Sequence, residues 1–171
     1  YAYRPESASM LPLILHDAAQ GRYETLLSQA RALSSDIGDS MALGMHLSVS
    51  CTEDPEIQAR PEDDKTILGN SIAEFIQVQC AAWPKGTRDP NFRKSLTGDV
   101  PVLAISGEYD PVTPPRYGDE VVKTLPNGRH LVLPGQGHSV LTTGCMPKLF
   151  AQFVETADAK TLDAGCLKRL K

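Results

Sequence analysis

The sequence lacks long apolar runs and large clusters of basic residues. None of its apolar segments approaches the roughly 20 residues that a transmembrane helix needs. Lysine and arginine total 17 against 21 aspartate and glutamate residues, which gives a net charge of −4. The one concentration of positive charge is the short tail at residues 168–171. These absences argue against a nucleic-acid-binding surface and against a membrane span.

Metal-binding patterns are also missing. The four cysteines contain no C-x-x-C pair, and the histidines show no ligand spacing, so we expect no metal ion and no cofactor. An even number of cysteines suits two disulfides, with three pairings open. Pairing in sequence order, Cys51 with Cys80 and Cys145 with Cys166, would stabilise the fold by about 2–4 kcal/mol per bridge. Oxidised cysteines would indicate a secreted or periplasmic protein, whereas four buried thiols would suit a cytosolic one.

The first part of the chain is patterned mainly for helices. Apolar residues recur at helical spacing in residues 11–19, 23–33 and 72–80, whereas residues 52–64 are acidic, contain two prolines and are expected to be a loop. Residues 41–51 are mostly apolar, and their second half fits either a helix or a strand. We therefore expect residues 1–97 to form a mainly helical segment.

The pattern changes near residue 98. Residues 100–105 form a short, nearly continuous apolar run, which is typical of a strand buried on both faces of a parallel sheet. A helical stretch at 116–125, a second strand at 130–133 and a last helix at 149–157 follow. This alternation predicts an α/β fold with a parallel crossover over residues 98–171. Two strands do not make a stable sheet alone, so further strands should come from an upstream segment.

One acidic residue and one histidine follow the two strands at comparable places. Asp110 lies in a proline-rich loop after the first strand, and His138 lies between Gly135 and Gly137 after the second. Ligands of open α/β sheets bind beyond the carboxyl ends of the strands, where these loops meet. A carboxylate there would orient the imidazole and stabilise its charged form during proton transfer. Taken singly, Asp110 could simply initiate a turn and His138 could be an ordinary loop residue.

These loops resemble the C-terminal region of α/β-hydrolases, and more narrowly the tripeptidyl-aminopeptidase-like group, relatives of proline iminopeptidase. The resemblance extends from about residue 11 to 167 and is strongest from 99 to 140. The segments that carry it are V-P-V-L at 100–103, G-E-Y-D-P-V-T-P at 107–114, G-Q-G-H-S at 135–139, S-C-T-E-D at 50–54, and the late pair Cys145 and Cys166.

The resemblance implies a serine hydrolase of the peptidase type. Asp110 would be the acid of a catalytic triad and His138 its general base, with residues from 11 to about 96 including a helical cap. Substrates would be short peptides cleaved from the amino end, or related amides and esters. The sequence contains no G-x-S-x-G motif, which precedes the acid and the histidine in this fold. We therefore expect an N-terminal part of the same protein to supply the serine.

Glu53 and Asp54 are candidates for substrate binding. Relatives use acidic residues of the cap region to hold the substrate's α-ammonium, and a charge-assisted contact there would select the peptide bond that is cleaved. The alternative is a solvated acidic loop, because further acidic residues follow up to position 64. Two other functions stay open at this point: an esterase or amidase of the same fold, and a non-catalytic binding module.

Overall fold

The computed structural model describes residues 3–54 and 57–170 and divides the chain into two compact units. One unit comprises residues 27–94, and the other combines residues 1–26 with residues 95–171. Each unit has its own cluster of buried apolar side chains and its own disulfide. The cap-type segment expected over residues 1–97 therefore spans both units, and its role as a cap stays a prediction.

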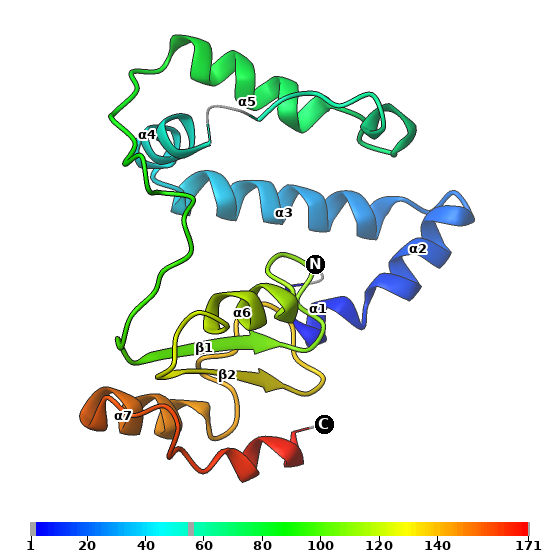
Figure 1. Ribbon diagram of the computed structural model, residues 1–171. Coiled ribbons are helices and arrows are strands. Elements are labelled where there is room, and N and C mark those ends of the chain that lie inside the picture. Colours follow the sequence, from blue (N-terminus) through cyan, green and yellow to red (C-terminus); the bar gives the residue numbers. More distant parts are fainter. Residues whose placement is uncertain (1–2, 55–56, 171) are drawn as a thin grey trace. The chain divides into compact units, whose positions relative to one another are not determined.

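The unit of residues 27–94 is helical. Helix α3, Glu24–Ser40, leads into it and is followed by α4, Leu43–Glu53, the short 3-10 turn η1, Asp63–Lys65, and α5, Ser71–Ala82 (Figure 1). The core lies between α4 and α5, where the Cys51–Cys80 disulfide joins the two helices beside Leu47 and Trp83. Residues 43–53 are helical throughout, and this conformation places Leu47 and Cys51, four residues apart, on the one face that packs against Cys80 of α5.

The other unit begins with two helices, α1, Pro5–Ala8, and α2, Leu11–Ala19. The predicted helix at 11–19 is confirmed, and its Ile14 side chain is almost fully buried. The second predicted stripe, at 23–33, begins a longer helix than expected, because α3 continues to Ser40.

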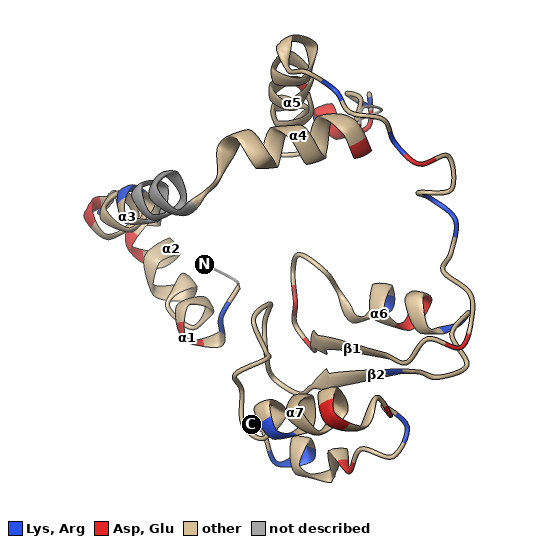
Figure 2. Cartoon of the chain, turned by 90° about the vertical axis from the view of Figure 1, so that its left-hand side faces the viewer, with Lys and Arg blue, Asp and Glu red and all other residues tan. Residues whose placement is uncertain are grey.

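A two-stranded parallel sheet forms the centre of this unit. Strand β1, Val102–Gly107, pairs with β2, Gly128–Leu133, and helix α6, Pro115–Val122, connects them. Helix α7, Met146–Thr156, follows β2, and the two helices lie on opposite sides of the sheet (Figures 1 and 2). The predicted strand–helix–strand–helix order is confirmed, although both strands begin two residues away from the expected positions.

The core of this unit fills the space between β2, α7 and the C-terminal 3-10 segment η2, Ala164–Arg169. A second disulfide, Cys145–Cys166, ties the start of α7 to η2. Both bridges thus join cysteines that are neighbours in sequence order. The buried apolar members of the cluster are Leu131, Leu133, Val140, Met146, Leu149, Leu162 and Leu167.

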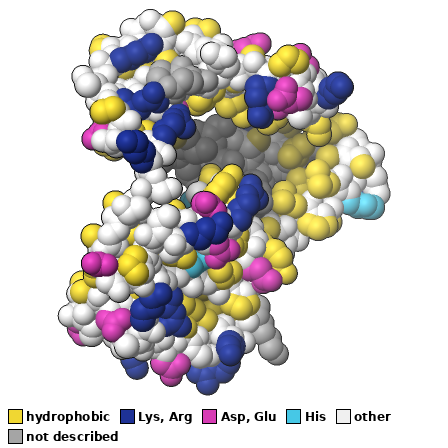
Figure 3. Space-filling model, in the orientation of Figure 1, with side chains coloured by type: hydrophobic (Ala, Val, Ile, Leu, Met, Phe, Trp, Pro, Cys, Tyr) yellow, Lys and Arg dark blue, Asp and Glu magenta, His cyan; other side chains and the backbone are white. Residues whose placement is uncertain are grey.

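The surface of the described chain carries charge of both signs. Basic and acidic side chains lie interspersed among apolar ones on the face drawn in Figure 3. None of the helices that the structure describes combines the length and the apolar character that crossing a bilayer requires.

Candidate active site

Two loops meet at one edge of the sheet. Gly107 ends β1 and pairs in register with Leu133, which ends β2. Asp110 and His138 follow these two residues in the chain. Since parallel strands deliver their carboxyl ends to a common edge, the register alone brings both loops together.

Hydrogen bonds join the two loops directly. The Glu108 N–H donates to the Leu133 carbonyl oxygen at 3.0 Å, and the Tyr109 N–H donates to the Gln136 carbonyl oxygen at 2.9 Å. In return, the Gly135 N–H donates to the Glu108 carboxylate at 2.8 Å. The acid loop, residues 108–114, and the histidine loop, residues 134–139, are therefore fixed to each other and to the end of β2 by two backbone hydrogen bonds and one bond to a carboxylate.

Gly107 permits this close approach. A β-carbon at this position would lie 1.9 Å from the Gly137 carbonyl oxygen and 2.5 Å from the Gln136 carbonyl oxygen, well inside van der Waals contact. Both neighbours are backbone atoms, so they cannot turn aside as a side chain would. Glycine at residue 107 is thus a steric requirement for the contact between the two loops.

The Asp110 carboxylate faces the His138 imidazole. Nδ1 of His138 lies 3.1 Å from Oδ1 and 3.0 Å from Oδ2 of Asp110. Because an ionised carboxylate only accepts hydrogen bonds, Nδ1 must carry the hydrogen, which leaves the Nε2 lone pair as the proton acceptor. Asp110 is only 5% exposed, whereas one third of the His138 side chain is exposed. The buried acid can orient the ring, and the ring stays accessible.

Three further donors hold Asp110. Its Oδ1 accepts from the Val112 and Thr113 N–H groups at 2.8 and 2.9 Å, and its Oδ2 accepts from the Thr113 hydroxyl at 2.8 Å. Burial by itself raises the pKa of Asp110, but these hydrogen bonds and the one from His138 lower it from 3.8 to about 2. The acid is consequently ionised across the whole physiological range.

Several supporting residues had not been predicted from the sequence. Asp110 does form the turn that was its alternative interpretation, and Thr113 belongs to that turn; an Asp three residues before a Thr is a detectable signal for it. Glu108 and Tyr3 carry no such signal. The Tyr3 carbonyl oxygen accepts from the His138 N–H at 2.7 Å, and its ring packs edge-on against the imidazole with the centroids 5.0 Å apart.

The two acidic residues predicted to bind substrate lie in the other unit. Glu53 ends helix α4, and its carbonyl oxygen accepts from the Arg88 guanidinium at 3.0 Å. The Asp54 carboxylate forms an ion pair with Arg93 at 2.9 Å. Asp54 is therefore already neutralised in part, whereas the Glu53 side chain is partly exposed.

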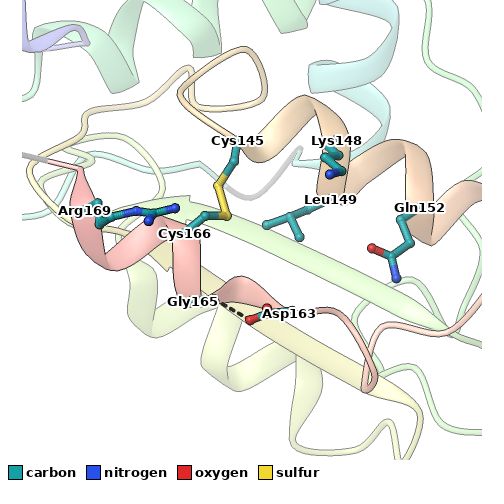
Figure 4. A pocket seen from close by; sticks show the side chains of 8 residues that line it. All are labelled: Cys145, Lys148, Leu149, Gln152, Asp163, Gly165, Cys166 and Arg169. Carbon is teal, nitrogen blue, oxygen red and sulfur yellow. Dashed lines mark hydrogen bonds between the residues drawn. A yellow bond between two sulfur atoms is a disulfide. The ribbon is translucent and has the colours of Figure 1, made fainter.

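Two cavities open on the surface of the sheet-containing unit. A cavity of about 380 Å³ contains His138 in its lining, together with apolar side chains of Ile105, Val140, Leu141 and Phe150. A larger one, of about 580 Å³, lies between α7 and η2 beside the Cys145–Cys166 disulfide (Figure 4). Neither Asp110 nor His138 lines the larger cavity, so the smaller one is the cavity that belongs to the candidate site.

The parallel strands, the crossover helix and the carboxylate–imidazole pair at the strand ends define the C-terminal region of an α/β-hydrolase. The comparison with protein families agrees with this class. The chain belongs to the TAP-like protein family, whose model matches residues 65–166.

Curated relatives share a shorter stretch. The chain is 45% identical over 88 residues to a protein named "Putative non-heme bromoperoxidase BpoC" in two strains of Mycobacterium tuberculosis, CDC 1551 / Oshkosh and H37Rv. The match covers 44% of this chain and 32% of each relative, so the chain spans about one third of the length of these relatives. No solved structure matches the chain significantly.

Proposed function

We propose that this chain supplies the acid and the general base of a serine hydrolase that cleaves short peptides at the amino end. The observation that carries the proposal is the hydrogen bond between buried Asp110 and accessible His138 at the carboxyl edge of the sheet. Membership of the TAP-like family supports a hydrolase of this fold. No G-x-S-x-G motif occurs in the sequence, so an N-terminal part of the protein would supply the serine.

The geometry suits a two-step acyl transfer. His138 Nε2 would take the proton of the serine hydroxyl as the serine oxygen attacks the scissile carbonyl carbon. The proton would then pass from Nε2 to the leaving amine as the carbon–nitrogen bond breaks, which leaves an acyl-enzyme. A water molecule would then give its proton to Nε2 as its oxygen attacks the acyl carbon, and Nε2 would return that proton to the serine oxygen as the acid is released. Asp110 would stabilise the imidazolium that forms in both steps without itself taking the proton.

The role of His138 is tested in the intact protein with aminoacyl and tripeptidyl reporter substrates. His138→Ala should lower kcat by at least about 10³-fold, since general-base catalysis and nucleophile activation are both lost. His16→Ala is the matched control, because His16 is an exposed helical histidine whose ring hydrogen-bonds with the Gln20 side chain at 2.8 Å. Full activity of His138→Ala would refute the assignment.

Recognition of the substrate's amino end is a separate part of the proposal. We propose that Glu53 holds the α-ammonium group of the peptide. Glu53→Gln should then raise KM about tenfold for a free-amine peptide and leave an N-blocked ester unaffected. Asp54→Asn is the control, because the Asp54 carboxylate already pairs with Arg93. Equal turnover of free-amine and N-blocked substrates by the wild type would instead favour the esterase alternative.

The similarity to the mycobacterial relatives favours a second candidate, peroxide-dependent bromination. Formation of a brominated product from bromide and hydrogen peroxide by the intact protein would support it. If the same site is used, His138→Ala should abolish this activity as well.

Localisation forms the last part of the proposal. Two disulfides are compatible with an extracellular protein, because such bridges persist in oxidising compartments. We propose that the protein acts in the periplasm or outside the cell, on small peptide or ester substrates that reach those compartments.

A further inference from the structure

Outside the candidate site, a serine, a histidine and an aspartate of the sheet-containing unit are joined by consecutive hydrogen bonds. His130, on β2, places Nδ1 2.9 Å from the Asp119 carboxylate on α6. Its Nε2 lies 2.9 Å from the Ser106 hydroxyl on β1. The Ser106–His130–Asp119 cluster therefore connects both strands and the crossover helix through one imidazole ring.

The surroundings of the cluster exclude a nucleophilic role. The His130 side chain is 4% exposed and Ser106 is buried. A β-carbon on Gly118 would lie 2.5 Å from His130 Nε2, so the backbone of α6 packs directly against the ring. A substrate carbonyl group could reach the Ser106 hydroxyl only if α6 moved away from the sheet.

The position of the cluster in the chain points to another role. Ser106 precedes the acid loop by one residue at the end of β1, and Asp119 lies in the helix that begins directly after that loop. We propose that the Ser106–His130–Asp119 cluster is a positioning device that fixes both ends of the acid loop and so holds Asp110 against His138. This inference rests on the proposed function of the Asp110–His138 pair.

The direction of each hydrogen bond follows from the chemistry of the groups. The Asp119 carboxylate only accepts, so His130 Nδ1 carries the hydrogen and Nε2 accepts from the Ser106 hydroxyl. Asp119→Ala removes the acceptor at one end of the Ser106–His130–Asp119 hydrogen-bonded series. Asp119→Asn keeps a carbonyl oxygen that accepts from Nδ1. Asp119 is 66% exposed, so neither variant leaves a buried cavity.

Kinetics of the intact protein test the proposal first. Asp119→Ala should lower kcat about tenfold while KM stays within about twofold. A displaced Asp110 carboxylate reduces the stabilisation of the transition state more than it reduces the affinity for the substrate. Asp119→Asn should restore at least about half of the wild-type kcat. Glu120→Ala is the matched control on the same helix, with an exposed carboxylate that pairs with Lys123, and should behave as wild type. Unchanged kcat in Asp119→Ala, or an equal loss in Glu120→Ala, would overturn the proposal.

A spectroscopic readout separates this proposal from the proposed function. The proton on His138 Nδ1 should give a downfield resonance, which would be assigned by its absence in His138→Gln. This resonance should shift or broaden in Asp119→Ala and stay in place in Asp119→Asn and Glu120→Ala. If the wild type cleaves none of the substrates, the proposed function fails, and this resonance still decides whether the cluster positions Asp110. An unperturbed resonance in Asp119→Ala would exclude the positioning role.

Discussion

The Asp110 carboxylate accepts hydrogen bonds both from its own turn and from the His138 ring. Four donors converge on its two oxygens, two of them backbone N–H groups of its own turn and one the His138 ring. A buried carboxylate with so many donors is held as an anion in a fixed orientation, because its charge would be costly without them. The same hydrogen bonds that orient the histidine also contribute to the stability of the fold.

Stability should therefore depend on pH through Asp110. Its folded-state pKa, about 2, lies below the unfolded value, so its contribution is complete above about pH 4 and is lost as the pH falls toward 2. That contribution is at most about 2 kcal/mol. In urea unfolding, the difference between wild type and Asp110→Asn should be largest at pH 6 and shrink between pH 4 and pH 2.

The control for this experiment is Asp99→Asn, an exposed aspartate in the same unit. Its free energy of unfolding should stay within about 0.5 kcal/mol of the wild type across the range. A difference between wild type and Asp110→Asn that stayed constant down to pH 2 would contradict the role of the ionised carboxylate.

Between elements, the decisive contact is that of the two loops at the sheet edge. The strands supply the register, but the loops are fixed to each other by the hydrogen bonds of Glu108, Tyr109 and Gly135. The approach is close enough that the end of β1 has no room for a β-carbon. The distance between acid and base is consequently set by backbone packing as much as by the two side chains.

Gly107→Ala tests this packing. The added methyl group would meet two backbone carbonyl groups, so we expect a loss of about 3 kcal/mol or more in the free energy of unfolding. The intact protein should also lose kcat, because the acid loop and the histidine loop are pushed apart. Chemical unfolding and steady-state kinetics measure the two effects.

Gly44→Ala is the matched control. Gly44 lies in helix α4, and a β-carbon there meets only the Trp83 ring at 3.8 Å, an ordinary contact. Alanine should stabilise the helix by about 0.5–1 kcal/mol. Wild-type stability and kcat in Gly107→Ala would show that the two loops can separate without consequence.

At the scale of the whole molecule, the candidate site residues are distributed unevenly between the two units. Asp110, His138 and the Ser106–His130–Asp119 cluster all belong to the unit of residues 1–26 and 95–171, whereas Glu53, the proposed ammonium ligand, belongs to the unit of residues 27–94. Each unit has its own disulfide, which lies within its own cluster of buried apolar side chains. In the proposed reaction the nucleophile would come from outside these two units.

A fluorophosphonate probe locates that nucleophile. After labelling of the intact protein, peptide mass spectrometry should find the probe on a serine outside these 171 residues, within a G-x-S-x-G motif. Labelling should slow at least about tenfold in Asp110→Asn, because the base then loses its orienting acid. Attachment to Ser106 or Ser139 would contradict the proposal, and absence of labelling would favour the non-catalytic alternative.

Local patterns encode much of this fold. Apolar periodicity was sufficient to predict the helix at 11–19, the alternation of strands and helices after residue 98, and the two loops that carry Asp110 and His138. The same patterns are ambiguous for residues 41–51, whose second half fits a helix or a strand equally well until the contact with α5 is known. Apolar periodicity also does not predict the extension of α3 to Ser40, because the later residues of this helix are largely polar.

The order of the elements and the positions of Asp110 and His138 after the two strands are therefore predictable from the sequence, since they depend on spacing between near neighbours. Folding decided how close the two loops approach, that His138 reaches Asp110, and that Ser106, His130 and Asp119 meet at all. These contacts join residues up to 30 positions apart, as Gly107 and Gly137 are, and most use backbone groups or common polar side chains. Such groups look alike in every sequence until the packed strands bring particular ones together.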